Sequence, residues 1–248
     1  MTTARPANTT RRALVTGASG DIGATICREL AAQGCFVYAH AHANAERAQA
    51  LVDEIQSNGG TAQVVTFDLT DAAATRAAIE TLLADGPIEV LVHNAGIHDD
   101  APLAGMRDEQ WHRVIDVSLH GFFHITQPLL LLMARARFGR IVAVSSVAAV
   151  LGNRGQVNYA AAKSALHGAA KSLAREMASR GITVNVVAPG VIAGRVADAA
   201  FDSEQIKQLV PAGRAGTATE VASLIAYLCS DAAGYINGQV IGINGGMG

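Results

Sequence analysis

The sequence has few of the residues that mark secreted, metal-binding or polyanion-binding proteins. Its 248 residues include only three cysteines, Cys27, Cys35 and Cys229, which lack the close spacing of metal ligands and the density of a disulfide framework. Cysteines scattered in this way are typical of free thiols in a reducing compartment, so we expect no metal site and a cytoplasmic location. The formal net charge of −2 leaves no strongly basic surface for nucleic acid.

Long apolar runs are also missing. The longest leucine-rich run, residues 129–133, is far too short to cross a bilayer. The N-terminus, MTTARPANTTRR, lacks the apolar segment of a secretory signal, and we interpret residues 1–11 as a loose tail. We therefore expect no membrane partner. Half of the residues are apolar and 16% are charged, a composition that suits a well-packed core.

What the sequence does contain is a regular alternation of short β-branched runs with helical patterns. The runs predict strands at 13–16, 35–39, 62–67, 88–92, 141–144, 182–187 and 240–243. Helices are predicted between them, at 22–33, from a cap at Asn44 to 57, from a cap at Asp71 to 83, through much of 107–134 with a bend at Pro128, and from a cap at Thr219 to 229. No linker or repeat interrupts the pattern. It predicts an α/β fold: a single doubly wound Rossmann-like domain over residues 12–248, with a parallel sheet of about seven strands and helices on both faces.

A glycine-rich turn, TGASGDIG at 16–23, follows the first predicted strand. Glycines such as Gly17 and Gly23 let the backbone approach a pyrophosphate, whose charge the N-terminus of the next helix stabilises. The alternative is a tight turn that binds nothing.

Polar residues after the next strands complete a candidate dinucleotide site. No acid follows the second strand to hold a ribose 2′-hydroxyl, so His40, His42 and Asn44 are candidates for a 2′-phosphate; the alternative is that the histidines are simply exposed. Asp68 is a candidate for the adenine amine or, alternatively, the cap of a turn. The Asn-Ala-Gly sequence at 94–96 either lets the chain pass close to a cofactor or forms an ordinary turn.

The catalytic candidates surround the fifth predicted strand. Tyr159 and Lys163 are four residues apart in a helical pattern, so their side chains share one face. An ammonium beside a phenol lowers the phenol pKa and makes it a usable general acid or base. Ser146, at the end of the strand, donates a hydrogen bond into the same space. The alternative is a surface tyrosine beside a solvated lysine.

Together these residues resemble the classical short-chain dehydrogenase/reductases along almost the whole chain from about Arg12. The matching pieces are TGASGDIG at 16–23, Asp68, NAG at 94–96, Ser146, YAAAK at 159–163, Asn185 and PG at 189–190. Residues 152–190 and the ending GQVIGINGGMG are most similar to β-ketoacyl-acyl carrier protein reductases. VHNAGIHDDAPLAGM and AHANAERA resemble the reductases of aryl-polyene or related specialised fatty-acid pathways.

The resemblance implies roles for these residues. Tyr159 is the implied proton donor to a ketone, Lys163 holds the nicotinamide ribose, and Ser146 binds the substrate carbonyl. NADPH is the implied cofactor and hydride donor, with NADH as the less favoured choice. Ser118 takes the place of the asparagine that completes the family's catalytic tetrad. The implied cofactor-binding residues are Gly17, Ser19, Asp21, Ile22, Gly23, His40, His42, Asn44, Asp68, Leu69, Asn94, Ala95, Gly96, Tyr159, Lys163, Pro189, Gly190 and Ile192.

Two further departures concern the phosphate-binding turn. Asp21 replaces the second glycine of the usual turn, and Gly20 stands where family members often carry a basic residue that supports NADPH. The resemblance nevertheless implies NADPH-dependent reduction of a β-ketoacyl thioester on acyl carrier protein. Two alternatives stay open: a dehydrogenase of a free small alcohol, sugar or steroid, and a dinucleotide sensor without turnover.

The resemblance also implies partners. Arg137 and Arg180 occupy the positions at which the ketoacyl reductases dock acidic acyl carrier protein; the alternative is two solvated surface charges. A homotetramer is implied, built through the long helices before and after the fifth strand and through the C-terminal strand region.

Overall fold

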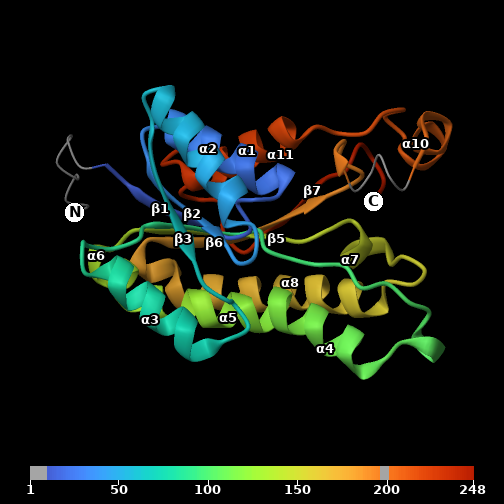
Figure 1. Ribbon diagram of the computed structural model, residues 1–248, viewed down its shortest axis with the longest axis horizontal. Helices are drawn as coiled ribbons and strands as arrows, with labels where there is room; N and C mark the ends of the chain where they lie inside the picture. Colours follow the sequence, from blue (N-terminus) through green and yellow to red (C-terminus); the bar gives the residue numbers. More distant parts are fainter. Residues whose placement is uncertain (1–9, 196–200) are drawn as a thin grey trace.

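Seven parallel strands form the centre of the molecule (Figure 1). The computed structural model describes residues 10–195 and 201–248. The strand order is β3-β2-β1-β4-β5-β6-β7, so successive connections run in opposite directions from the middle of the sheet. A crevice at the carboxyl ends of the strands follows from that reversal. The strands are β1 (Arg12–Val15), β2 (Phe36–Ala41), β3 (Thr61–Thr66), β4 (Val90–His93), β5 (Gly139–Val144), β6 (Ile182–Pro189) and β7 (Val240–Ile243).

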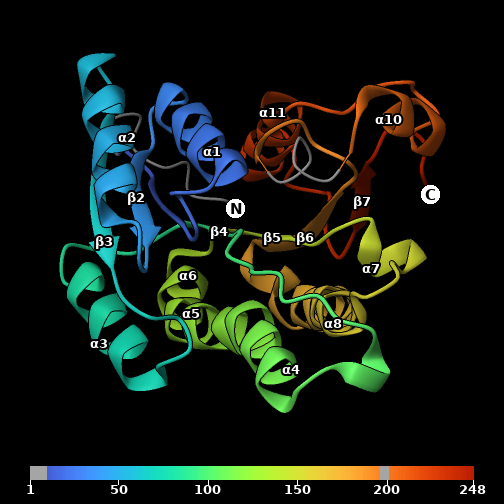
Figure 2. The ribbon, with the colours of Figure 1, turned by 45° about the vertical axis from the view of Figure 1, so that its right-hand side comes forward.

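Helices cover both faces of the sheet, which confirms the predicted fold class (Figure 2). One face carries α1 (Asp21–Ala32), α2 (Ala45–Ser57) and α11 (Ala218–Cys229). The other carries α3 (Ala72–Leu83), α8 (Val157–Met177) and the helical run before β5. Alternate residues of β1 pack into different cores: Ala13 and Val15 face the first set of helices, and Leu14 faces the second. Strands buried on both faces have to be apolar throughout, as the sequence pattern indicated.

The helical run between β4 and β5 changes type along its length. It consists of α4 (Asp108–Ile115), a π-helical turn (Asp116–His120), α5 (Gly121–Thr126), a 3₁₀ turn (Gln127–Leu129) and α6 (Leu130–Ala136). Pro128 lies in the 3₁₀ turn, where its missing N–H interrupts the α-helical hydrogen bonds. In the part of the chain that the structure describes, Asp108–Ala136 alone is long and apolar enough to cross a membrane. Its buried residues Ile125, Leu129 and Met133 pack in the same core as β4 and β5, as in a core helix of a globular domain.

The helix starts show where capping was predicted correctly and where it was not. Asp71 caps α3, because its carboxylate accepts from the backbone N–H groups of residues 73 and 74. Asn44 precedes α2 but makes no side-chain capping bond. Thr219 is not the cap of α11. Thr217 accepts from the Glu220 N–H at 3.1 Å, and the Glu220 carboxylate returns to the Thr217 N–H at 2.8 Å. This capping box starts the helix two residues earlier than predicted.

Two short helices border the carboxyl end of the sheet. They are α7 (Ala148–Leu151) and α10 (Ser203–Leu209). Residues 1–9 of the predicted tail lie outside the described residues. Arg11, the last residue of that predicted tail, pairs with Asp231 at 2.6 Å.

Candidate active site

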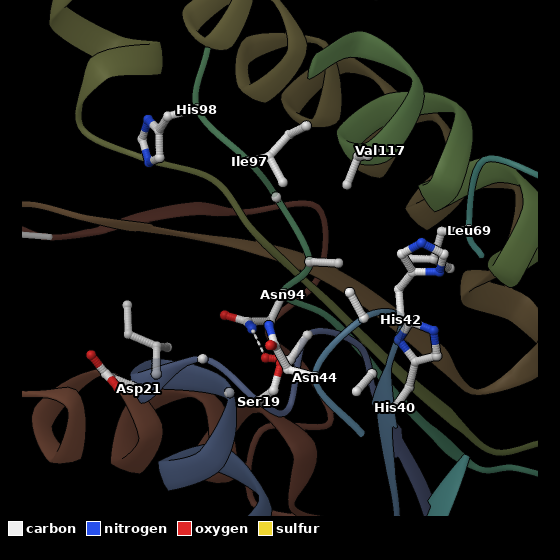
Figure 3. A pocket seen from close by; sticks show the side chains of 18 of the residues that line it. Ser19, Asp21, His40, His42, Asn44, Leu69, Asn94, Ile97, His98 and Val117 are labelled. Atoms are coloured by element: carbon white, nitrogen blue, oxygen red, sulfur yellow. Dashed lines mark hydrogen bonds between the residues drawn. The ribbon is translucent and has the colours of Figure 1, made fainter. Parts of the chain in front are cut away.

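A cavity of about 610 Å³ lies at the carboxyl ends of β1, β2, β4 and β6 (Figure 3). Residues far apart in the sequence meet there because parallel strands all end at the same edge of the sheet. Tyr159, Lys163, Pro189 and Gly190 are outside its lining. The predicted cofactor residues that line it are Gly17, Ser19, Asp21, Ile22, Gly23, His40, His42, Asn44, Asp68, Leu69, Asn94, Ala95, Gly96 and Ile192.

The turn between β1 and α1 has no room for a side chain at Gly23. A Cβ atom on Gly23 would lie 2.2 Å from the Gly17 carbonyl oxygen and 2.7 Å from the Asn94 amide nitrogen. The Asn94 side-chain amide stabilises the turn by donating hydrogen bonds to the carbonyls of Thr16 at 3.1 Å and Gly17 at 3.2 Å. The turn therefore delivers the N-terminus of α1 directly to the cavity, an arrangement that fits a pyrophosphate.

Asp21 places a carboxylate at this anion-binding end, and two arginines offset it. Arg47 of α2 lies 3.4 Å from the carboxylate and Arg195, after β6, lies 3.5 Å from it. Burial raises the pKa of Asp21, but the two arginines outweigh burial and hold the pKa below its usual value. Sequence analysis missed both arginines, since nothing in the local pattern links positions 47 and 195 to position 21.

The ribose end contains one predicted residue that does not suit its role. His40 is buried, its Nε2 lies 2.9 Å from the Phe67 carbonyl, and its ring contacts the Phe67 ring. Burial lowers the pKa of His40 to about 4, so the ring is neutral near pH 7 and offers no charge to a 2′-phosphate. The interpretation of His40 as a phosphate partner, and the alternative of an exposed histidine, are both wrong. His42 has a side chain that is 63% exposed at the cavity wall.

Asp68 caps a turn, as one of its two interpretations predicts, and it also lines the cavity. One carboxylate oxygen accepts from the Thr70 N–H at 2.9 Å and hydroxyl at 2.8 Å, which caps the turn after β3. The other oxygen lies 4.0 Å from His42 Nε2, at the cavity lining. The turn thus holds a carboxylate at the wall of the cavity, and its binding of adenine stays a prediction.

Tyr159 and Lys163 both project from α8 and are both buried. The Lys163 ammonium donates to the carbonyls of Val144 at 2.9 Å and Ala95 at 3.5 Å, and it lies 5.9 Å from the centre of the Tyr159 ring. Burial lowers the pKa of Lys163 to about 8. A Cβ atom on Gly96 would lie 2.8 Å from the ammonium, so a larger residue at this position would force the Lys163 side chain to shift.

The predicted lowering of the Tyr159 pKa by Lys163 is not found. Burial of the phenol raises the pKa of Tyr159, and a hydrogen bond with Ser146 only partly offsets that effect. The reason is geometric: the ammonium is directed at two backbone carbonyls rather than at the phenol oxygen. Ser146 does lie beside Tyr159, as predicted from its place at the end of β5.

Ser118 lies in the π-helical turn and is fully buried. Its hydroxyl has no hydrogen-bond partner among the residues that the structure describes, and it lies close to the Gly96 backbone that the Lys163 ammonium also approaches. Its carbonyl accepts from His93 Nε2 at 2.9 Å, and His93 Nδ1 lies 3.3 Å from the Thr16 hydroxyl. Sequence analysis missed His93, which links the phosphate-binding turn to the Ser118 turn.

His98, also missed, lies over the catalytic tyrosine. Its ring stacks on the Tyr159 ring with 4.2 Å between centroids and 27° between planes. Figure 3 shows His98 at the opposite side of the cavity from His40 and His42. The cavity therefore runs from the exposed side chain of His42 to His98, which separates it from the buried Tyr159.

The remaining predicted residues lie away from the cavity lining. Gly190 donates its N–H to the Ile243 carbonyl at 3.0 Å, and the Pro189 carbonyl accepts from the Val147 N–H at 2.7 Å. Arg137 and Arg180 precede β5 and β6, so both lie at the amino ends of the strands, the edge opposite the cavity. Arg137 donates to the Ser179 carbonyl at 2.9 Å.

Comparison with known proteins agrees with this geometry. Residues 17–248 match the family described as "Enoyl-(Acyl carrier protein) reductase". The chain is 44% identical over 238 residues to the 3-oxoacyl-[acyl-carrier-protein] reductase FabG of Escherichia coli (strain K12), covering 95% of this chain and 96% of that protein. It is 43% identical over 241 residues to FabG of Staphylococcus aureus (strain Mu50), covering 96% of this chain and 98% of that protein. The chain therefore belongs to the short-chain dehydrogenase/reductase family, whose members use a nicotinamide dinucleotide.

Proposed function

We propose that the protein reduces a β-ketoacyl thioester on acyl carrier protein to the β-hydroxyacyl thioester, with NADPH as the reductant. The observation that carries the proposal is the meeting of Ser146, Tyr159 and Lys163 directly behind Ala95, Gly96 and His98, which line the cavity. Identity of 43–44% along nearly the whole chain to proteins named for that reaction supports the substrate class.

The protein's own groups supply the proton and position the ketone. Ser146 donates a hydrogen bond to the ketone oxygen, and Tyr159 transfers its phenol proton to the same atom as the carbonyl carbon is reduced. NADPH supplies the hydride when it is bound. The hydrogen bond with Ser146 favours the phenolate left on Tyr159, and the Lys163 ammonium holds the nicotinamide ribose beside it.

Ser118 is placed to return a proton to this pair. Its buried hydroxyl lacks a partner among the described residues and faces the space that the Lys163 ammonium borders. A buried hydroxyl without a hydrogen bond is costly, so this site favours an ordered water between Ser118 and Lys163. That water would extend the proton path in place of the family's asparagine.

The preference for NADPH rests on charge at the ribose end. β2 ends without an acid to hold a ribose 2′-hydroxyl, and His42 and Asn44 line the cavity there. Gly20 provides no cation, but Arg47 lies within 3.4 Å of Asp21, one turn into α2. Arg47 therefore places positive charge near the end of the site where a 2′-phosphate would lie.

Docking of the acyl carrier protein depends on assembly of the subunits in this proposal. Because Arg137 and Arg180 lie at the opposite edge from the cavity of their own chain, docking through them would serve the site of a neighbouring subunit. Phe123 of α5 and Leu131 of α6 are 63% and 61% exposed, which favours burial of these helices in a homotetramer. The cytoplasm, which contains both NADPH and acyl carrier protein, is the proposed location.

A direct assay tests the function. NADPH oxidation is measured with a β-ketoacyl thioester and with a panel of free ketones at equal concentration. We expect much higher kcat/KM for the thioester. Equal or better use of a free ketone would favour a dehydrogenase of small alcohols, sugars or steroids, and no oxidation with any substrate would favour a dinucleotide sensor.

A further inference from the structure

The imidazole of His98 is held in one position over Tyr159. The two rings stack at 4.2 Å with 27° between their planes. His98 lies in the loop after β4, whereas Tyr159 lies in the first turn of α8, so the stack joins these two segments. Stacking of this kind fixes the orientation of both rings.

Neighbouring amides determine which nitrogen of His98 carries the proton. Gln156 accepts at its carbonyl oxygen from the Asn153 amide at 2.9 Å, which fixes the orientation of the Gln156 amide group. Its nitrogen donates to an Asp100 carboxylate oxygen at 2.8 Å and lies 3.3 Å from His98 Nδ1. An amide nitrogen only donates, so His98 Nδ1 is the acceptor and the proton of the neutral ring is on Nε2.

The ring is neutral near pH 7 despite a nearby acid. Asp100 lies 3.9 Å from His98 Nδ1 and favours the charged ring, while burial and the Lys163 ammonium disfavour it. The net effect is a pKa of His98 below its usual value, with burial as the largest cause. The neutral tautomer with hydrogen on Nε2 is therefore the form that a substrate meets.

The Nε2–H group is the free donor at this end of the site. His98 lines the cavity with 43% of its side chain exposed, and within residues 10–195 and 201–248 no hydrogen bond involves its Nε2. A donor that is fixed in direction, unpaired and next to a general acid is suited to bind a polar atom adjacent to the reacting group.

A β-ketoacyl thioester has such an atom, because its thioester carbonyl is separated from the ketone by a single carbon. We propose that His98 is a specificity-determining residue whose Nε2–H donates a hydrogen bond to the thioester carbonyl while Ser146 and Tyr159 engage the ketone. The assignment rests on the proposed function and deepens it, since it explains how the site would distinguish a 1,3-dicarbonyl from an isolated ketone.

Two variants of His98 test the N–H donor and the aromatic ring separately. His98→Phe keeps an aromatic ring over Tyr159 and removes the donor, whereas His98→Gln keeps an N–H donor without the aromatic ring. His112→Phe, at an exposed position on α4, is the matched control. Each protein is assayed with acetoacetyl-N-acetylcysteamine and with a ketone of equal length that lacks the thioester carbonyl. Calorimetry with the β-hydroxyacyl thioester product measures binding without turnover.

Loss of one neutral hydrogen bond predicts a drop of about three- to tenfold in kcat/KM for the thioester in His98→Phe, mainly through KM. Product affinity should fall by a similar factor, the simple ketone should be reduced as in the wild type, and His98→Gln should recover part of the loss. Circular dichroism checks folding, and His98→Ala provides the same comparison if His98→Phe does not fold.

The possible failures are distinguishable. If the wild type does not reduce the thioester, the proposed function fails and this assignment fails with it. If the wild type reduces the thioester and His98→Phe does so equally well, the assignment alone is overturned. An equal loss on both substrates also overturns it, because His98 would then act only through Tyr159.

Discussion

The two ends of the cavity are built in different ways. At the catalytic end, Tyr159, Lys163 and Ser118 are buried, and even a single added methyl group at Gly96 would collide with the ammonium. At the ribose end, His42 is 63% exposed and Arg47 is 47% exposed, and both lie beside carboxylates at the surface. The groups at the buried end are thus held in place by packing. The charges at the other end are exposed to solvent, so salt screens them. Substitutions at the two ends should therefore differ in size and in salt dependence.

The largest effect is expected at the catalytic end, from Tyr159→Phe. Removing the phenol proton should lower kcat by about 10²–10⁴-fold, the usual contribution of a general acid. Cofactor affinity, measured by fluorescence titration of NADPH, should stay close to that of the wild type because the phosphate and ribose contacts are unchanged. Retention of more than about a tenth of the wild-type rate would exclude Tyr159 as the acid.

Lys163→Met should reduce both turnover and NADPH affinity, by about tenfold or more, since the ammonium would contact the nicotinamide ribose and position it beside Tyr159. Lys163 also makes the stability of the wild type depend on pH, and Lys163→Met removes that dependence. The folded-state pKa of Lys163, about 8, is lower than its usual value of 10.5. Between these values the unfolded chain binds the extra proton, so wild-type stability gains from rising pH.

Thermal unfolding from pH 7 to pH 10 measures that gain. The Tm of the wild type should rise relative to that of Lys163→Met over this range. A constant difference between the two Tm values would mean that the lysine is not desolvated in the folded protein.

At the ribose end, Ala41→Asp should shift cofactor preference by about tenfold toward NADH, because a carboxylate repels a 2′-phosphate and accepts from a ribose hydroxyl. Ala41 lines the cavity at the end of β2. The ratio of kcat/KM for NADPH and NADH measures the shift, with Ala41→Asn as the uncharged control. Equal efficiency of the wild type with both cofactors would remove the basis for this difference between the ends.

The smallest effect is expected away from the cavity, from Arg137→Glu combined with Arg180→Glu. Exposed charges act mostly on association, so use of a carrier-bound ketone should fall several-fold at low salt, and the loss should shrink as salt screens charges over about 8–10 Å. A small thioester should be reduced as before. An equal loss on both substrates would instead indicate a role in folding or assembly, and no loss on either would leave two solvated charges.

The same division explains what could be predicted from the sequence. Strand–helix alternation, the position of Ser146 after β5 and the shared helix of Tyr159 and Lys163 follow from local spacing, and the structure confirms these positions. The burial of His40 could not be read in the same way, because its partner Phe67 belongs to another strand end. The pairing of Asp21 with Arg47 and Arg195 likewise depends on three elements meeting, as does the direction of the Lys163 ammonium. Sequence patterns predict which element carries a residue, but contacts between elements decide its charge.

His93 connects the phosphate-binding turn to the Ser118 turn as a fully buried, neutral imidazole, and this has a consequence for acid tolerance. Burial lowers the folded-state pKa of His93 to about 3, far below the usual value of 6.5. An unfolded chain therefore takes up a proton here between pH 6.5 and pH 3, and His40 adds a second below pH 6.5. Each group makes unfolding more favourable by up to about 1.4 kcal/mol per pH unit across its window. Mild acidification thus lowers the free energy of unfolding through two buried imidazoles, His93 and His40.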